Sequence, residues 1–334
     1  MKSEEPTTTG KLRKLRLLIV GAAVCLSLGQ ITPWLGDLHW SLELVCHFQI
    51  QFAFAAVALL LLAWLVRVRR ELPWLILPCL LGIFHLSPYY LEHKVPAADL
   101  SDETSLKIIS YNVLSSNTRH EDALNFLIAQ NADVIALYEV NSAWADAIDS
   151  RLNEFQGPMH QREDNFGISL ISRWPIEIIH FESPDASGVP LLHARITLPG
   201  GPVEVIACHP VPPGTSENLQ SRDIFIDRAA ELAGSATDPV LMVGDFNLSR
   251  WSPTYQRLLT KSNLANCRDG RGLKSTWFPR MIPLGFLPGL EIDHALLGPE
   301  FSVKSYTVGP KHGSDHSPLI LEVALKPAER SNTP

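Results

Sequence analysis

The sequence predicts an α/β domain built as a sandwich of two β-sheets with covering helices, preceded by apolar N-terminal helices. Two observations support this. Residues 105–326 hold many short apolar segments but few amphipathic ones, and most of the apolar segments end in polar residues, a pattern typical of a sheet sandwich. Residues 1–95 instead hold three long apolar stretches without charge, and 334 residues suffice for both regions.

The three uncharged stretches are residues 17–35, 44–66 and 72–91. A bilayer core needs roughly 20 residues of helix, which each stretch supplies. Basic residues precede the first stretch and separate the second from the third (67–70), whereas the loop between the first two has no Lys or Arg. The three stretches predict a multi-pass protein of the cell membrane, and the positive-inside rule places its N-terminus and the 67–70 loop in the cytoplasm. Three spans place everything after about residue 92 on the exoplasmic, periplasmic side.

Two alternatives remain open for this region. The first stretch has the basic start of a cleaved signal peptide, which would leave two spans and the domain on the same side. The third stretch is interrupted by Pro73, Pro78 and Pro88; if it lies only at the interface, the domain is cytoplasmic. Because the spans hold no Asp, Glu, Lys or Arg, they give no sign of the ion pathway that a transporter or sensor would need.

Charge and cysteine content narrow the function classes. Residues 1–95 carry 9 Lys/Arg and 6 Asp/Glu, whereas residues 96–334 carry 19 and 29, a net charge of −10. This is unlike the basic surface of tight, nonspecific nucleic-acid binders, although it leaves room for a local basic cleft. No Cys-x-x-Cys pair suggests structural zinc. The spacing leaves a Cys208–Cys267 disulfide open but favours two free, semi-buried thiols.

The elements of the domain follow from apolar periodicity and turn chemistry. Residues 96–104 are polar and acidic and are predicted to be a linker, and the tail 327–334 is predicted to be disordered. The helices are expected from stripes of apolar residues at helical spacing, near residues 120–131, 143–152, 217–234 and 252–262. The strands are expected from short apolar runs, at residues 107–113, 133–138, 166–172, 176–181, 191–198, 203–208, 240–243, 292–297, 303–308 and 318–325. Residues 263–290 are irregular and rich in Pro and Gly.

Polar side chains collect where these strands end. Val240 to Val243 form an apolar strand; Gly244 then breaks the run, and Asp245 and Asn247 point the same way because they are two residues apart. The other strand-end residues are Asn112, Glu139, His209, Asp293 with His294, and Asp315 with His316. Any one of them is ordinary turn chemistry, but together they predict a polar cleft at one edge of the sandwich.

These residue types suit phosphate-ester hydrolysis. Glu139 is a hard oxygen ligand for Mg²⁺ or Mn²⁺, and too few His and no Cys accompany it for a typical zinc site. A divalent cation with Asn and His donors neutralises charge on phosphoryl oxygens. A carboxylate–His pair activates water, and Asp293 is expected to orient His316.

The motifs resemble those of the endonuclease/exonuclease/phosphatase superfamily, the fold of deoxyribonuclease I, abasic-site endonucleases, inositol-phosphate 5-phosphatases and bacterial sphingomyelinases. They occur in the family's order over about residues 105–325, and membrane-anchored bacterial members look nearest. The matching segments are Ser110-Tyr111-Asn112-Val113, Asp133–Glu139, Gly167–Arg173, Ala207-Cys208-His209, Gly244-Asp245-Phe246-Asn247, Ile292-Asp293-His294 and Ser314-Asp315-His316-Ser317-Pro318.

The resemblance implies a four-layer α/β/β/α sandwich as the catalytic domain at residues 105–326. It implies a metal held by Glu139 with Asn112 close by and Asp315 as a second metal-side carboxylate. His209 and Asn247 would contact the scissile phosphate. The resemblance leaves both Asp245 and His316 open as the base, with Asp293 orienting His316.

The sequence therefore predicts a membrane-anchored, Mg²⁺- or Mn²⁺-dependent hydrolase of phosphodiesters or phosphomonoesters. Its partners would be the lipid bilayer and a phosphate-ester substrate. The substrate is either a nucleic acid or a phospholipid head group of the sphingomyelin type. The acidic charge slightly disfavours nucleic acid, whereas the membrane region and the apolar 263–290 loop favour lipid, although that loop could simply cover the core. A catalytically inactive binding protein is the remaining alternative.

Overall fold

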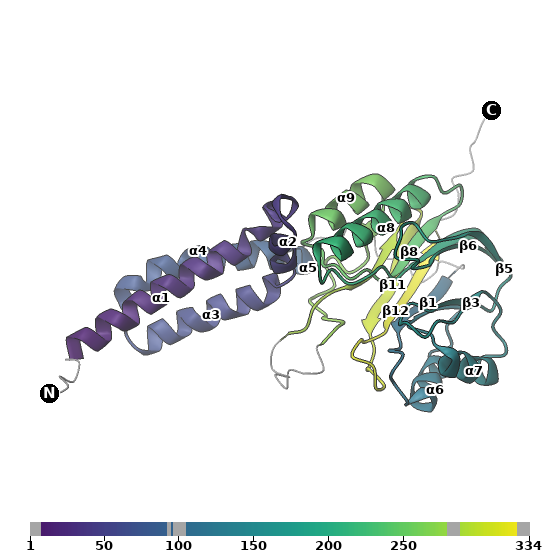
Figure 1. The fold of residues 1–334 in the computed structure, drawn as a ribbon, viewed down its shortest axis with the longest axis horizontal. Helices are drawn as coiled ribbons and strands as arrows, with labels where there is room; N and C mark the ends of the chain where they lie inside the picture. Colours follow the sequence, from purple (N-terminus) through teal and green to yellow (C-terminus); the bar gives the residue numbers. More distant parts are fainter. Residues whose placement is uncertain (1–7, 92–94, 96–104, 279–287, 326–334) are drawn as a thin grey trace. The chain divides into compact units, whose positions relative to one another are not determined.

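The chain divides into two compact units in the computed structural model, which describes residues 8–91, 95, 105–278 and 288–325. The first unit comprises residues 1–88 with 251–253 and 286–288, and the second comprises the rest (Figure 1). The predicted linker 96–104 and tail 327–334 lie outside the described residues. The units separate between Pro88 and Tyr89, seven residues before the boundary that hydropathy indicates.

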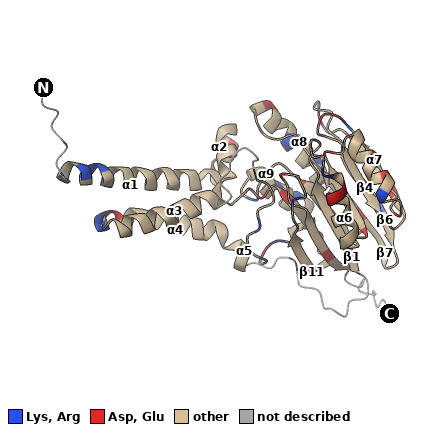
Figure 2. Ribbon diagram, turned by 90° about the horizontal axis from the view of Figure 1, so that it is seen from below, with Lys and Arg blue, Asp and Glu red and all other residues tan. Residues whose placement is uncertain are grey.

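The first unit is helical. Its three long helices lie side by side and bury small and branched residues between them, among them Ala23, Ala63 and Leu75 (Figure 1). The helices are α1 (Thr8–Gln30), α2 (Trp40–Cys46), α3 (Gln49–Leu65) and α4 (Leu72–Leu86), with short 3₁₀ turns at Thr32–Trp34, Gly36–Leu38 and Arg69–Glu71. Lys and Arg gather at the first turns of α1 and at the α3–α4 connection (Figure 2). An ion pair of 3.5 Å between Arg16 and Glu71 joins these two places.

The described helices differ in their fitness to cross a bilayer. The segment Gly10–Trp34 is long and apolar enough, as a signal sequence near an N-terminus also would be. Helices α2 and α3 qualify only when taken together, because they bend by 62° at the break between them. Helix α4, in the third predicted span, has 15 residues and is about 22 Å long, short of a hydrocarbon core of about 30 Å. The described residues thus contain one such helix, or two with the bent pair.

The described residues of the second unit form two mixed sheets of six strands each. The first has the order β11-β12-β1-β2-β4-β3, in which only β1 and β2 are parallel. The second has the order β5-β6-β7-β8-β10-β9, in which only β7 and β8 are parallel. The strands are β1 (Ser105–Asn112), β2 (Val134–Tyr138), β3 (Met159–His160), β4 (Ile168–Ser172), β5 (Ile176–Glu182), β6 (Leu191–Leu198), β7 (Gly201–Cys208), β8 (Val240–Asp245), β9 (Ala265–Asn266), β10 (Asp293–Leu297), β11 (Phe301–Val308) and β12 (Leu319–Leu325).

Successive side chains of each strand face opposite sides of its sheet, so the unit has one apolar core between the sheets and one on the outer face of each sheet. The unit is therefore a four-layer α/β/β/α sandwich. Ile108 of β1 and Val243 of β8 face each other's sheets in the central core. Ile109 instead packs outward against the first helical layer, and Met242 against the second. The outer layers are α6 (His120–Gln130) with α7 (Ser142–Arg151), and α8 (Ser216–Gly234) with α9 (Pro253–Ser262) (Figure 1). The predicted sandwich is confirmed.

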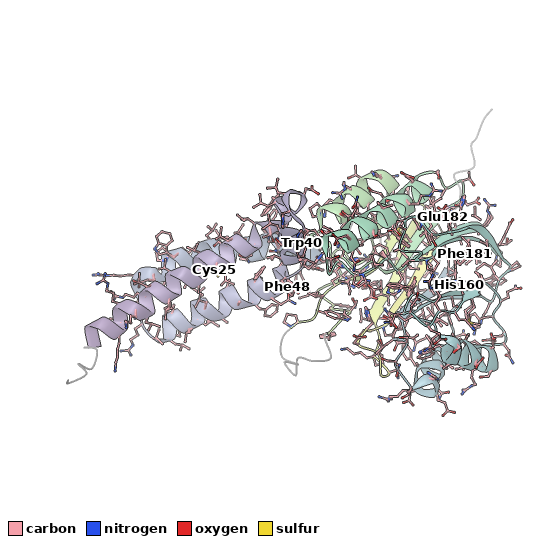
Figure 3. All side chains as sticks on the ribbon, viewed as in Figure 1. Cys25, Trp40, Phe48, His160, Phe181 and Glu182 are labelled. Atoms are coloured by element: carbon pink, nitrogen blue, oxygen red, sulfur yellow. The ribbon has the colours of Figure 1, made fainter. Side chains whose placement is uncertain are left out.

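Two short strands, β3 and β9, escape the sequence prediction because two residues carry no periodic signal. His160 of β3 and Phe181 of β5 lie at sheet edges with ring centroids 5.1 Å apart (Figure 3). Cys208 and Cys267 are free and buried, in different cores, which agrees with the expectation of separate thiols.

Candidate active site

Strand topology brings the predicted strand-end residues to one edge of the sandwich. In the first sheet β1 and β2 are parallel, so Asn112 ends β1 beside Tyr138, the residue before Glu139. In the second sheet β7 and β8 are parallel, so Cys208, which precedes His209, pairs with Gly244, which precedes Asp245. Strand β10 runs antiparallel to β8 and therefore begins at this edge, with Asp293 opposite Asp245.

Asn112 joins the two sheets across the site. Its side-chain amide donates to Glu139 Oε1 at 3.0 Å and to Asp245 Oδ2 at 3.1 Å. Its own Oδ1 accepts from Leu114 N at 3.0 Å, which fixes which way the amide points. Glu139 Oε2 accepts from Ser115 N at 3.1 Å. Glu139 has a left-handed backbone (φ +62°), a conformation rarely adopted by non-glycine residues and often found at functional sites.

Asp245 is the centre of the cluster. Its Oδ2 lies 3.6 Å from His209 Nε2 and 3.5 Å from His316 Nε2, in addition to the bond from Asn112. Its Oδ1 accepts from Asn247 N at 3.0 Å. Three predicted site residues from three other strand ends thus converge on one carboxylate oxygen.

Asp293 and His316 form a buried pair. His316 Nδ1 lies 3.1 and 3.0 Å from the two carboxylate oxygens of Asp293, so its Nε2 is directed toward Asp245. Asp293 also receives support from Thr276, whose hydroxyl oxygen accepts from Asp293 N at 3.2 Å. The geometry is that of a carboxylate orienting an imidazole.

The surroundings of His209 and His316 shift their pKa values in opposite directions. Burial opposes the charged form of His316, but Asp293 and Asp245 together raise its pKa to about 10. Burial and the positive charge of His316 lower the pKa of His209 to about 3. At neutral pH one imidazole is therefore a cation and the other is neutral. Burial also raises the pKa of Asp245 well above the range usual for Asp, although His316 opposes the shift.

Two predicted residues make other contacts. Asn247, with a left-handed backbone (φ +50°), donates its side-chain amide to Pro210 O at 2.9 Å. Asp315 accepts from Trp277 Nε1 at 3.2 Å, whereas the contacts described for Glu139 run to Asn112 and Ser115. Among the described residues, the hydrogen bonds and ion pairs of the cluster therefore bypass the carboxylate of Asp315.

Sequence reasoning missed two supporting hydroxyls. Besides contacting Asp293, Thr276 accepts Ser317 N through its carbonyl at 2.8 Å, so it ties β10 to the segment that carries His316. Ser314 donates to Asn112 O at 2.8 Å and accepts from His316 N at 3.0 Å. Ser314 stands in a quoted motif and could have been noticed there, whereas Thr276 lies in an irregular stretch without any signal.

The donors fit a hard divalent cation. Each Glu139 oxygen accepts one described protein hydrogen bond, which leaves lone pairs for a cation, and the carboxylate of Asp245 lies on the other side of the Asn112 amide nitrogen. Asp245, Asp293 and His316 also offer one ligand atom each within 4.8 Å of the others. In that group, however, His316 Nδ1 is already engaged with Asp293. Glu139 with Asn112 is therefore the better match to a cation.

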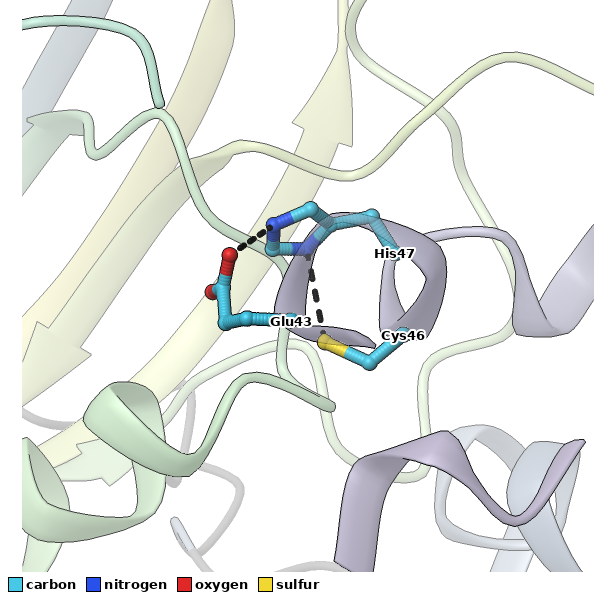
Figure 4. Close-up of side chains that lie close together, drawn as sticks. All are labelled: Glu43, Cys46 and His47. Carbon is cyan, nitrogen blue, oxygen red and sulfur yellow. Dashed lines mark hydrogen bonds and ion pairs between the residues drawn. The ribbon is translucent and has the colours of Figure 1, made fainter. Parts of the chain in front are cut away.

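A second group of possible metal ligands lies in the first unit, on helix α2. Glu43, Cys46 and His47 are buried within one helical turn (Figure 4). His47 Nε2 lies 3.3 Å from Glu43 Oε2, while Nδ1 of the same ring contacts the Cys46 sulfur at 4.0 Å. The two contacts use different ring nitrogens, so the imidazole of His47 lies between the carboxylate of Glu43 and the thiol of Cys46.

Solved structures with the same fold come from several sources. Humanized D. rerio TDP2 has a TM-score of 0.54 and 18% identity, covering 66% of this chain and 98% of that one. The 3′-5′ exonuclease NExo from Neisseria meningitidis has a TM-score of 0.52 and 18% identity, covering 66% and 100%. An AP endonuclease from Archaeoglobus fulgidus has a TM-score of 0.55 and 17% identity, covering 65% and 98%. These likenesses establish the fold of the second unit.

A comparison with curated protein sequences finds no match. The family model is the decisive comparison. Residues 109–316, more than half of the chain, match the model of the endonuclease/exonuclease/phosphatase family. This range includes every predicted site residue from Asn112 to His316. The chain is a member of the endonuclease/exonuclease/phosphatase family.

Proposed function

We propose that this chain is a divalent-metal-dependent phosphoesterase that hydrolyses a phosphodiester or phosphomonoester by metal-assisted attack of water. One observation carries the proposal. Asp245 Oδ2 accepts from Asn112 and faces both His209 and His316, so residues from both sheets surround one carboxylate oxygen. A purely structural cluster would have no reason to bury a cationic and a neutral imidazole around a carboxylate at the mouth of a sandwich.

Glu139 and Asn112 hold Mg²⁺ or Mn²⁺ in this proposal, with Asp315 as a further carboxylate on the metal side. The two carboxylate oxygens of Glu139, each with a lone pair left over, support this assignment, and Asn112 lies beside them. A bound cation supplies Lewis-acid stabilisation of the charge on the phosphoryl oxygens. The contact of Asp315 with Trp277 makes it the less direct of the three residues.

The remaining residues act on the phosphate and the proton. His209 and Asn247 bind the scissile phosphate, His209 through a neutral imidazole. His316, positively charged at neutral pH, stabilises negative charge and donates a proton, while Asp293 orients it. Asp245, whose pKa is raised by burial, accepts the proton of the attacking water. The electrostatics thus favour Asp245 over His316 as the base.

The substrate is the finer part of the proposal. Among similar structures, D. rerio TDP2 holds a single-strand DNA product and NExo from Neisseria a product DNA hairpin, which supports a nucleic acid. The net charge of −10 on residues 96–334 and the apolar helices of the first unit support a phospholipid head group. Both substrate classes contain a phosphodiester, so an assay that measures hydrolysis of each class separately distinguishes them.

We also propose that the apolar helices anchor the protein in the cell membrane, with the catalytic unit on the exoplasmic side. The segment Gly10–Trp34 and the common location of the basic residues at one end of the helices support an N-terminus in the cytoplasm. The side of the catalytic unit depends on the number of crossings, because one or three place it outside the cytoplasm and two place it inside. Fusion of a periplasm-specific reporter after Leu325 tests this: activity supports an exoplasmic catalytic unit, and a silent reporter with an active cytoplasmic one refutes it.

The full chain in detergent, assayed on a panel of phosphoesters with Mg²⁺ and with chelator, tests the catalytic proposal. The panel holds plasmid DNA, single-stranded RNA, sphingomyelin vesicles and a nitrophenyl phosphodiester. We expect metal-dependent hydrolysis of at least one substrate, lost in His316→Ala and kept in His160→Ala, a histidine at the sheet edge. Hydrolysis that survives in His316→Ala would disprove the site, and binding without turnover would favour an inactive binding protein.

A further inference from the structure

A buried charged network lies behind the catalytic cluster and begins at Tyr89. Tyr89 is completely buried, its hydroxyl donates to Glu291 Oε2, and the guanidinium of Arg250 lies 4.8 Å from its ring centre. Its backbone is also bound, since Gly272 N donates to Tyr89 O at 2.8 Å. Tyr89 belongs to the second, catalytic unit.

Two arginine–carboxylate pairs complete the network. Arg268 lies with Nη1 at 3.0 Å from Glu291 Oε1 and binds the Tyr306 hydroxyl through Nε and Nη2 at 2.9 and 2.6 Å. Arg250 pairs with Asp269 at 2.7 Å. Two buried cations thus meet two buried carboxylates. Burial alone would raise the pKa of Glu291, but Arg268 holds it below its usual value, so the carboxylate is charged.

Glu291 lies two residues before Asp293, the first residue of β10. Between them, Ile292 O accepts from Phe246 N at 2.8 Å, the residue after Asp245. On the other side, His294 Nδ1 lies 3.8 Å from Glu291 Oε1, and its Nε2 contacts Leu248 O at 2.8 Å. The side chain of Glu291 is therefore linked to both chain segments that carry the catalytic aspartates.

Val95, the next described residue after Leu91, also belongs to this unit. Val95 belongs to the core between the two sheets, and its carbonyl accepts from Arg271 Nη2 at 3.1 Å. Tyr90, the residue after Tyr89, is by contrast exposed over 61% of its surface. Tyr89 and Tyr90 thus form a natural pair for comparison, one inside the network and one outside it.

We propose that Tyr89 is a positioning residue of the active site, acting through Glu291 to set the place of Asp293 and so the orientation of His316. The proposal rests on the proposed phosphoesterase function. Each Glu291 oxygen has one main partner, Arg268 or Tyr89. Removing the phenol hydroxyl leaves Oε2 of a buried carboxylate without that donor, and the charge is then relieved by movement of the β10 start.

The test compares Tyr89→Phe with Tyr90→Phe in the full chain, with a nitrophenyl phosphodiester and Mg²⁺. We expect kcat of Tyr89→Phe to fall about tenfold, which is the usual effect of one buried hydrogen bond to a charged group. KM should change less than about twofold, because the substrate contacts are intact. The alkaline limb of the pH–rate profile should move to lower pH, because a displaced Asp293 supports the His316 cation less well. Tyr90→Phe should match the wild type in all three.

Two further measurements separate positioning from loss of fold. The folded fraction, from thermal melting in detergent, normalises kcat, and Arg268→Lys gives a second route to the same Glu291 contact. A normalised kcat and pH profile of Tyr89→Phe equal to those of Tyr90→Phe would overturn the proposal, even if the melting temperature falls. A wild-type protein without phosphoesterase activity would instead refute the proposed function itself, so the two failures are distinguishable.

Discussion

His316 Nδ1 lies within 3.1 Å of both carboxylate oxygens of Asp293, in a site where both residues are buried. The two residues are 23 positions apart in the chain, one at the start of β10 and the other just before β12. Because this contact occupies one ring nitrogen, it decides which nitrogen of His316 is directed to Asp245.

Replacing Asp293 with Asn should reduce kcat by at least about a hundredfold, the range of general acid–base contributions. Asn keeps the size of the side chain but removes the charge that stabilises the His316 cation. Steady-state hydrolysis of a phosphodiester measures the effect. Asp227→Asn, at a surface ion pair with Lys261 on α8 and α9, is the matched control and should leave kcat unchanged. Equal rates in the two variants would contradict the assigned role.

The pH dependence of stability should report the same pair. The pKa of His316 is raised from 6.5 to about 10 in the folded protein. The stabilisation is therefore fully present below about pH 6.5 and is lost as the pH rises through about 10. Thermal melting between pH 6 and pH 10 should show a steeper fall for the wild type than for Asp293→Asn. Parallel curves would mean that Asp293 does not stabilise the His316 cation in the folded state.

Replacing Glu139 with Gln should weaken the metal requirement more than the fold. We expect the Mg²⁺ concentration for half-maximal activity to rise by at least about tenfold, because a charged ligand becomes neutral. The melting temperature in chelator should change little, since Gln can still accept from Ser115 N. Glu154→Gln, at a surface ion pair with Arg173, serves as control. An unchanged Mg²⁺ titration in Glu139→Gln would remove this residue from the proposed metal site.

Gly244 should tolerate no side chain. Its φ is +156°, and a Cβ atom there would lie 1.9 Å from the carbonyl oxygen of Cys208 on the neighbouring parallel strand. Gly244→Ala should therefore cost at least about 3 kcal/mol and reduce the yield of folded protein. Gly214→Ala, where a Cβ meets nothing within 4 Å, should behave as the wild type in thermal melting. A stable Gly244→Ala would show that β7 and β8 can separate at this point.

Much of the catalytic unit was predictable because its signals are local. The apolar run from Val240 to Val243 predicts β8. The Pro and Gly residues at 199–202 indicate the turn of the β6–β7 hairpin, in which Leu198 pairs with Gly201. Most of the strand-end positions of the site also follow from these runs. The two-residue strands β3 and β9 gave no such signal, since their pairing depends on neighbours distant in the chain.

The membrane region shows the limit of a hydropathy argument. The stretch 44–66 is one apolar run in the sequence, yet the helix breaks at His47 and Phe48 and bends by 62°. The stretch 72–91 likewise runs past the end of α4 at Leu86, and Tyr89 belongs to the catalytic unit. Apolar composition is the same for a lipid-facing and a protein-facing side chain, so it cannot distinguish them.

By itself the sequence determined the sandwich, the family motifs and the residues available for phosphate chemistry, because periodicity and short motifs are properties of neighbouring residues. Only the tertiary structure decided how these residues are used. Asp245 lies between a protonated and a neutral histidine. The carboxylate of Asp315 accepts from Trp277, and the hydroxyl of Tyr89 donates to Glu291. Each of these depends on strand pairing across long sequence distances and on burial, which together control distance and charge.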